Sequence, residues 1–151
     1  MTDQEMIREA KKLLLRENVN TCYPNGKPFK SFSYYPRKDQ DNAYDGEYKE
    51  WYPNGILNLH CYYKDDELHG KFQNFDEYGE PFQECYYVHG KKQGQAKEFH
   101  QDGTIFRLEN YLDDKLDGEY QEWDINGTLV YHCIYKNGEI IQEINGYNRT
   151  K

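Results

Sequence analysis

Glycines and large aromatic residues recur along the chain every 24 residues, with mostly polar residues between them. One set of glycines has this spacing: Gly46, Gly70, Gly94 and Gly118. A second set follows nine positions later: Gly55, Gly79, Gly103 and Gly127. Two aromatic positions keep the period: Trp51, Phe75, Phe99 and Trp123, and Tyr63, Tyr87, Tyr111 and Tyr135. A period of this length indicates one supersecondary unit stacked on copies of itself.

Each copy contains two segments with the composition of β-strands, separated by turn residues. The first turn of each copy includes one of the predicted turn glycines: Gly26, Gly55, Gly79, Gly103 and Gly127. The second turn falls at Asp65-Asp66, His89-Gly90, Asp113-Asp114 and Asn137-Gly138. We therefore predict an all-β fold, a single-layer antiparallel solenoid of β-hairpin repeats that forms a continuous meander.

The period divides the chain into three parts. Full repeats occupy residues 46–69, 70–93, 94–117 and 118–141. Residues 21–45 form a partial leading repeat with a longer loop at 36–45, because Gly26 and Gly55 are 29 residues apart. We predict an N-terminal capping helix within residues 1–20, a repeat domain at 21–145 and a polar tail at 146–151.

The expected helix runs from about Asp3 to Arg16. Thr2 and Glu5 have the spacing of a capping box, and apolar residues recur at helical spacing: Met6, Ile7, Ala10, Leu13 and Leu14. The ends of a solenoid expose unpaired strand edges unless something covers them. We interpret the helix as a terminal cap, with a partner-binding helix as the alternative.

The first turn sets the register of the strands, because directly opposed residues of an antiparallel pair share a face. A two-residue type I′ turn at Asn54-Gly55 places Cys61 opposite Tyr48, and we favour this turn. A type I turn with a bulge is the alternative, and it would shift the pairing by one and move Trp51 beside Leu57.

The second turn, at Asp65-Asp66, places Cys61 opposite Gly70 and Tyr63 opposite Leu68. One face, here called the cysteine face, then carries the structural core. Leu57 and Leu129 are also expected on this face. The core residues are Tyr48, Cys61, Tyr63, Phe72, Cys85, Tyr87, Tyr111, Tyr120, Cys133 and Tyr135. The opposite face carries a candidate partner-binding aromatic row: Trp51, Tyr62, Phe75, Phe82, Tyr86, Phe99, Phe106 and Trp123.

Composition agrees with a thin sheet. Hydrophobic residues make up 36% of the chain, yet 16 tyrosines, seven phenylalanines and two tryptophans are placed periodically. Disordered chains are poor in aromatic residues, so the mean hydropathy of −1.17 reflects exposed surface. The chain has neither an apolar run of membrane-spanning length nor a signal peptide pattern, so we expect an intracellular, cytoplasmic protein.

The net charge excludes some partners. With 27 acidic and 19 basic residues the formal charge is −8. Nucleic-acid phosphates and anionic lipid headgroups repel an acidic surface, so we expect no nucleic acid and no membrane partner.

The cysteines do not have the spacing of a metal site or of a disulfide. Cys61, Cys85 and Cys133 share one repeat position, which places neighbouring thiols two strands apart, about 9 to 10 Å. A disulfide needs Cα atoms within about 7 Å, and one zinc ion needs both sulfurs at about 2.3 Å. We interpret the repeat cysteines as small core residues. Cys22 occupies a position that is aromatic in the other copies, which also suggests packing.

Histidines and glutamates also lack a convergent arrangement. His60 and His132 each precede a repeat cysteine, but consecutive strand residues point to opposite faces. Glu50, Glu98 and Glu122 align as an acidic ladder with rungs about 10 Å apart. We therefore predict no catalytic residues, no bound metal and no cofactor.

The segments GEYKEWYPNG and GEYQEWDING, followed by HCYYKDDELHG and HCIYKNGE, resemble the MORN-repeat variant family over about residues 21–141. Similar repeats occur in bacterial proteins described as YwqK-type antitoxins and in giant DNA viruses. The resemblance implies a role as a scaffold or dimerisation module. Phospholipid binding is not implied, because the Tyr-x-Gly-x-Trp core of classical MORN repeats is missing.

We therefore expect a non-enzymatic scaffold that binds a protein partner, or a second copy of itself, through a sheet face or edge. Two alternatives follow from the resemblance: an antitoxin that neutralises a toxin by direct binding, and a virion-associated structural protein of a large DNA virus.

Overall fold

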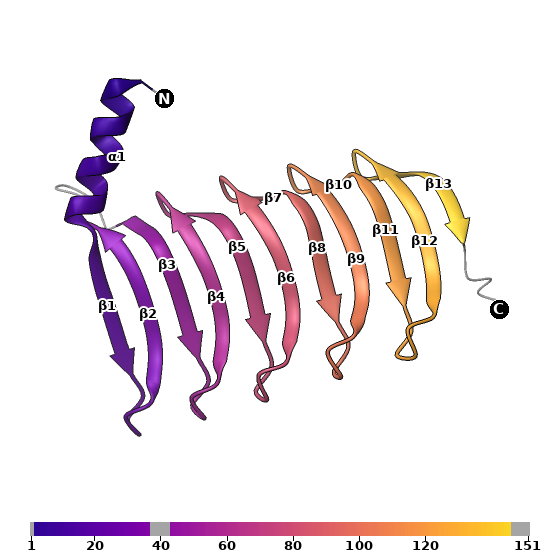
Figure 1. Ribbon diagram of the computed structural model, residues 1–151, viewed down its shortest axis with the longest axis horizontal. Helices are drawn as coiled ribbons and strands as arrows, with labels where there is room; N and C mark the ends of the chain where they lie inside the picture. The colour runs from indigo at the N-terminus through magenta and orange to yellow at the C-terminus, as the bar shows by residue number, and fades with distance from the viewer. Residues whose placement is uncertain (1, 37–42, 146–151) are drawn as a thin grey trace.

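One helix and one thirteen-stranded sheet make up the computed structural model, which describes residues 2–36 and 43–145 (Figure 1). Helix α1 spans Asp3–Leu15. The strands are β1 (Glu17–Cys22), β2 (Pro28–Tyr35), β3 (Ala43–Trp51), β4 (Leu57–Lys64), β5 (Glu67–Phe75), β6 (Pro81–Val88), β7 (Lys91–Lys92), β8 (Gly94–Phe99), β9 (Ile105–Leu112), β10 (Lys115–Leu116), β11 (Gly118–Trp123), β12 (Leu129–Lys136) and β13 (Glu139–Asn145).

The strands lie in sequence order, and every pair is antiparallel, so the predicted single-layer hairpin solenoid is confirmed. The short strands β7 and β10 pair with β6 and β9 and precede β8 and β11 in the chain. The predicted tail at 146–151 and most of the long loop predicted at 36–45 lie outside the described residues.

Within residues 2–36 and 43–145, no second layer packs on the sheet (Figure 1). The accessible surface is 10192 Å², whereas a compact protein of 18.2 kDa exposes about 8,100 Å². Few side chains are therefore fully buried, and packing occurs mainly between neighbours on the same face of the sheet.

The first turns correct the predicted turn type. The Gly55 amide donates to Tyr52 O at 2.8 Å and the Tyr52 amide donates to Ile56 O at 2.8 Å, which describes a type I turn followed by a glycine bulge. Gly55 has φ 87°, while Asn54 is not in the left-handed region. The preferred two-residue turn was wrong, because a type I′ turn needs positive φ at both central residues and only the glycine has it here. The same pair of backbone bonds closes the turn at Asp124 and Gly127, so the turn type is a property of the repeat.

A second irregularity restores the predicted pairing along most of the strand. Trp51 lies opposite Leu57, as the alternative turn requires, but Glu50 lies opposite Leu59 and Tyr48 opposite Cys61. Leu57 therefore shares a face with Trp51, and the prediction that it belongs to the cysteine face was wrong. Leu129 is likewise opposite Trp123.

The second turns are the type I′ turns that a two-residue hairpin needs. Asp65 and Asp66 have φ 52° and 71°. Tyr63 lies opposite Leu68 as predicted, but Cys61 lies opposite Phe72 and not Gly70, because the register shifts between these pairs. Gly70, with φ 116°, lies in the shifted segment.

The stacked turns bond to one another at both ends of the strands. At the first turns, the Tyr52 hydroxyl donates to Phe75 O at 2.9 Å and the Asn54 amide nitrogen donates to Glu77 O at 2.8 Å. At the second turns, the Gly90 amide donates to Leu68 O at 2.9 Å. Each repeat is therefore held to the next outside the strand ladder as well as within it.

Helix α1 begins at the predicted capping box, in which the Glu5 amide donates to Thr2 Oγ1 at 3.3 Å. Figure 1 shows α1 rising beyond the strand ends at the N-terminal end of the sheet. Lys12 Nζ donates to Asp65 Oδ1 at 2.6 Å, and Arg16 pairs with Asp45. The exposed apolar side chains of the helix include Met6, Ile7, Leu14 and Leu15.

Replacing Gly118 by Ala should lower the free energy of unfolding by about 2 to 3 kcal/mol. Gly118 has φ 117°, and a Cβ there would lie 3.2 Å from the Asn110 Cβ. The control is Gly127→Ala. Gly127 has φ 78°, and nothing lies within 4 Å of an added Cβ, so this substitution should lower the free energy of unfolding by only about 1 kcal/mol. Urea denaturation of both variants checks this, and an equal loss at the two sites would contradict it.

Replacing Asp65 by Asn should loosen α1, because the Lys12–Asp65 pair is worth about 1 kcal/mol. Burial raises the pKa of Asp65, but hydrogen bonds from Lys12 and Tyr35 outweigh it, so the pKa lies below its usual value. The pair therefore stabilises α1 above the unfolded pKa, near 3.9, and is lost as the pH falls through the folded pKa.

Hydrogen exchange measures this anchoring. Amides of α1 should exchange roughly fivefold faster in Asp65→Asn than in the unchanged chain. Asp113→Asn is the matched control, because Asp113 holds the same repeat position with φ 50° and bonds to Gln93. Unchanged exchange in Asp65→Asn would show that this pair does not hold the helix.

Candidate functional site

The cysteine face carries a row of core residues in which aromatic and small residues alternate from β3 to β6. Phe32 lies opposite Tyr48, Tyr48 opposite Cys61, Cys61 opposite Phe72, and Phe72 opposite Cys85. Of the ten core residues named from the sequence, Tyr48, Cys61, Cys85 and Cys133 are buried and the others are half-buried. Rings meet within this face, as Tyr48 and Tyr63 do at 5.6 Å between centroids.

Burial makes the repeat thiols poor nucleophiles. It raises the pKa of Cys61 to about 12, and it raises the pKa of Cys85 and Cys133 as well. All four cysteines are free thiols, and Cys22 is exposed on β1. Thiolate chemistry is therefore unfavourable on the cysteine face.

The third repeat breaks this row, a feature that the sequence reasoning missed. Ala96 stands where the other copies have Tyr or Phe, and the opposing residue is Glu109 in place of cysteine. Glu109 is 7% exposed and accepts a hydrogen bond from the Tyr111 hydroxyl at 3.0 Å. Aligning the four copies reveals the exchange, because both residues change in the same copy.

Arg107 balances the charge of this repeat. Its guanidinium lies 3.6 Å from Glu109, 3.5 Å from Glu98 and 3.3 Å from Glu122. Two members of the predicted acidic ladder thus share one arginine, and the third, Glu50, pairs with Lys30 at 2.7 Å. These carboxylates serve as ion-pair partners that hold adjacent strands together.

The structure divides the candidate aromatic row on the opposite face into two groups. Trp51, Phe75, Phe99 and Trp123 are half-buried at strand ends next to the first turns, and each lies opposite an apolar or proline residue. Phe82 and Phe106 lie one position after the residues opposite Phe75 and Phe99. Tyr62 and Tyr86 lie nearer the other end of β4 and β6, and they are 37% and 49% exposed.

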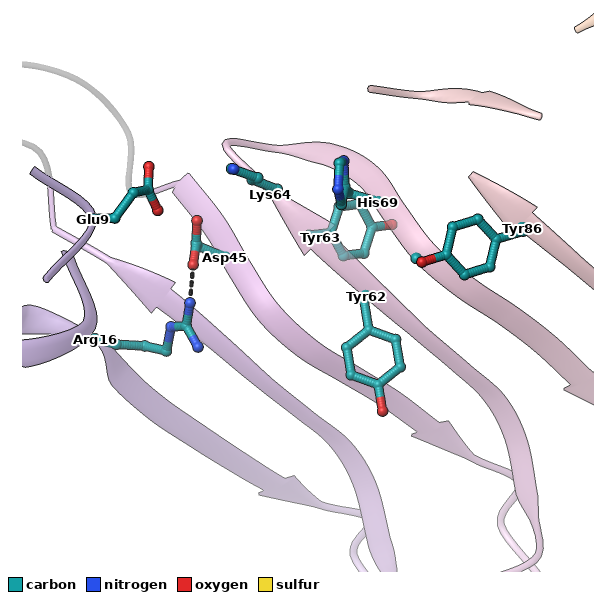
Figure 2. A pocket seen from close by; sticks show the side chains of 9 residues that line it. Glu9, Arg16, Asp45, Tyr62, Tyr63, Lys64, His69 and Tyr86 are labelled. Carbon is teal, nitrogen blue, oxygen red and sulfur yellow. Dashed lines mark hydrogen bonds and ion pairs between the residues drawn. The ribbon is translucent and has the colours of Figure 1, made fainter. Parts of the chain in front are cut away.

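Tyr62 and Tyr86 line a pocket of about 400 Å³ between α1 and the opposite face (Figure 2). Gly70 lies on β5, between β4 and β6. Because it has no side chain, it leaves room beside Tyr62: a Cβ added at Gly70 would lie 3.4 Å from the Tyr62 Cβ. Figure 2 shows the Tyr86 hydroxyl pointing toward β4. We call this the tyrosine pocket; its other lining residues are Glu9, Arg16, Asp45, Tyr63, Lys64 and His69.

The tyrosine pocket mixes charges of both signs. Arg16 pairs with Asp45 at one side, as Figure 2 shows, while Lys64 lies near His69. Burial, followed by the nearby His89 and Lys64, lowers the pKa of His69, which favours a neutral ring near pH 7. The arrangement offers two aromatic walls with hydrogen-bonding groups, which suits the binding of a peptide side chain.

A second hollow of about 230 Å³ lies beside the first turns and includes Phe82 and Phe99. It is lined as well by Asp76, Glu80, Pro81, His100 and Gln101. His100 contacts Trp123 O at 3.0 Å, so its ring joins neighbouring repeats. The remaining four residues of the predicted aromatic row line neither this hollow nor the tyrosine pocket; they are Trp51, Phe75, Phe106 and Trp123.

Within residues 2–36 and 43–145, no group of three His, Cys, Asp or Glu side chains could hold a metal ion. His60 contacts Glu47 at 2.9 Å, across the strand pair. No helix in these segments is long and apolar enough to cross a membrane.

Comparison with known protein families finds a match to a repeat family. Residues 44–65, 92–113 and 116–137 match the MORN repeat variant, so these three segments are repeats of this type. Each matched segment contains one complete first turn, at Gly55, Gly103 or Gly127, and β3 and β4 flank the turn at Gly55. No curated protein sequence matches the chain. The antitoxin and viral associations lie beyond what these matches establish.

Alkylation should separate the cysteines. In the folded protein at pH 8, iodoacetamide should label Cys22 and leave Cys61, Cys85 and Cys133 unmodified, because burial blocks access and disfavours the thiolate. Peptide mass spectrometry gives the positions, and all four should be labelled in urea. Labelling of Cys61 at the rate of Cys22 would contradict this.

Proposed function

We propose that this chain is a non-enzymatic scaffold that binds another protein at the tyrosine pocket on the opposite face of its sheet. The observation that carries the proposal is the pair of half-exposed rings, Tyr62 and Tyr86, held on neighbouring repeats around Gly70. MORN repeats belong to interaction-type proteins that are generally non-enzymatic, which supports the same class.

Tyrosine suits such a surface because its ring adds large contact area while its hydroxyl keeps a polar partner. The two rings stand on strands of one continuous ladder, so little conformational freedom is lost on binding. Arg16 and Asp45 fix one wall of the pocket by their ion pair, and Asp45 is only 4% exposed. A partner segment would meet a largely preformed site.

The charge of the chain favours a partner segment with basic residues. The excess of eight acidic residues, 27 against 19, gives a negative field that attracts cations and speeds association at low salt. The same charge argues against nucleic acid and anionic membranes as partners. Glu9 at the rim of the tyrosine pocket can pair with a lysine or arginine of the partner.

A photoreactive amino acid placed at position 62 or 86 tests this role in cells of the source organism. Both positions should crosslink to the same protein, and Tyr62→Ala or Tyr86→Ala should each weaken its affinity about tenfold. The variants should keep the fold, because both side chains are partly exposed.

Tyr78 is the matched control, because it is a tyrosine 76% exposed at a first turn, away from the tyrosine pocket. A photoreactive group at position 78 should not capture that protein, and Tyr78→Ala should leave its affinity unchanged. Equal capture at positions 62, 86 and 78 would refute the proposed site. Turnover of a substrate by the pure protein would refute the non-enzymatic role.

A further inference from the structure

Within residues 2–36 and 43–145, four Asn-Gly pairs lie in turns of the solenoid, and they differ in how the asparagine side chain is held. The pairs are Asn25-Gly26, Asn54-Gly55, Asn126-Gly127 and Asn137-Gly138. All four asparagines are exposed. An asparagine followed by glycine can lose its side-chain amide when the glycine nitrogen attacks the side-chain carbonyl carbon, since glycine has no side chain to hinder the approach.

The first two asparagines are fixed at both side-chain atoms. Asn25 Oδ1 accepts from the Lys27 amide at 3.0 Å, and its Nδ2 donates to Pro53 O at 3.1 Å. Asn54 Oδ1 accepts from the Ile56 amide at 2.9 Å, and its Nδ2 donates to Glu77 O at 2.8 Å. The Nδ2 acceptors, Pro53 O and Glu77 O, belong to the first turn of the following repeat.

The last two asparagines are not fixed in this way. Within the described residues, the side chains of Asn126 and Asn137 make no hydrogen bond; only their backbone amides do, to Asp124 and Asp117. Space beside the glycine does not separate the sites, because nothing lies within 4 Å of the position that a Cβ would occupy at Gly127, at Gly138 or at Gly26. What Asn126 and Asn137 lack is the pair of side-chain hydrogen bonds.

The attacking nitrogen does not distinguish the pairs. The amides of Gly26, Gly55, Gly127 and Gly138 each donate one backbone hydrogen bond, at 2.9, 2.8, 2.9 and 2.8 Å. The difference between the sites therefore lies in the asparagine side chain. Two hydrogen bonds must break at Asn25 or Asn54 before the side chain can turn toward the glycine nitrogen.

We propose that Asn126 and Asn137 are sites of spontaneous deamidation, and that repeat stacking protects Asn25 and Asn54. At Asn126, the Gly127 nitrogen gives up its proton and forms a bond to Cγ, and the Nδ2 group leaves with a proton as ammonia. Water then adds to either carbonyl of the resulting succinimide and opens the ring to aspartate or isoaspartate. The balance is one water consumed and one ammonia released.

The two products differ in their effect on the fold. Aspartate is tolerated at this repeat position, because Asp102 occupies it in the third repeat and accepts from the Thr104 amide at 3.0 Å. Isoaspartate adds a carbon to the backbone of the turn that joins β11 and β12, which alters the glycine bulge. Each event also adds one negative charge to a chain with a formal charge of −8.

The full-length protein tests the proposal when it is incubated at pH 8 and 37 °C and mapped by peptide mass spectrometry over several weeks. Aspartate and isoaspartate should accumulate at Asn126 and Asn137 on the order of tenfold faster than at Asn25 and Asn54, since two hydrogen bonds protect each of the latter. Equal rates at the four sites, or a faster reaction at Asn54, would overturn the proposal.

The same incubation in urea is the control for local sequence. Unfolding removes the protecting hydrogen bonds, so the rates at Asn25 and Asn54 should rise to within a few-fold of the other two. A difference between the sites that persists unchanged in urea would assign the selectivity to neighbouring residues and would also overturn the role of repeat stacking.

Discussion

The structure depends on the bonding of each repeat to the next, because a single-layer sheet has no second layer against which to bury its side chains. The backbone ladder supplies most of these bonds, and both sets of turns extend it. Tyr52 reaches Phe75 O at the first turns, and Gly90 reaches Leu68 O at the second. A repeat therefore gains its stability from its neighbours, and the same contacts determine which turn side chains are fixed.

The glycines that open each repeat connect this stacking to the opposite face. Gly70 has φ 116°, a conformation that side chains rarely adopt, and it lies where the register of β4 and β5 shifts. The shift brings Phe72 opposite Cys61 and completes the core row. On the other side of the sheet, the absent side chain leaves the space between Tyr62 and Tyr86. One glycine thus serves the core and the tyrosine pocket together.

The third repeat shows how the core row on the cysteine face tolerates variation in sequence. The exchange of an aromatic–cysteine pair for Ala96 and Glu109 keeps the row filled, because the small residue makes room for the longer one and Arg107 offsets its charge. A buried carboxylate without such a partner would be strongly unfavourable. Compensation stays within one repeat and its neighbours because each repeat contacts only those.

The sequence by itself determined the period, the hairpin meander and the N-terminal helix, since these follow from the spacing of glycines, turn residues and aromatic rings. It also divided the residues between the two faces, except at Leu57 and Leu129, where the bulge changes the face. Only the tertiary structure decided the turn type at Asn54, the pairing of Cys61 with Phe72 and the tyrosine pocket. Bulges depend on hydrogen bonds between adjacent strands, and the pocket depends on where α1 lies against the sheet. Neither depends on residue spacing alone, so a repeat pattern predicts the ladder but not its irregularities or the surface that they create.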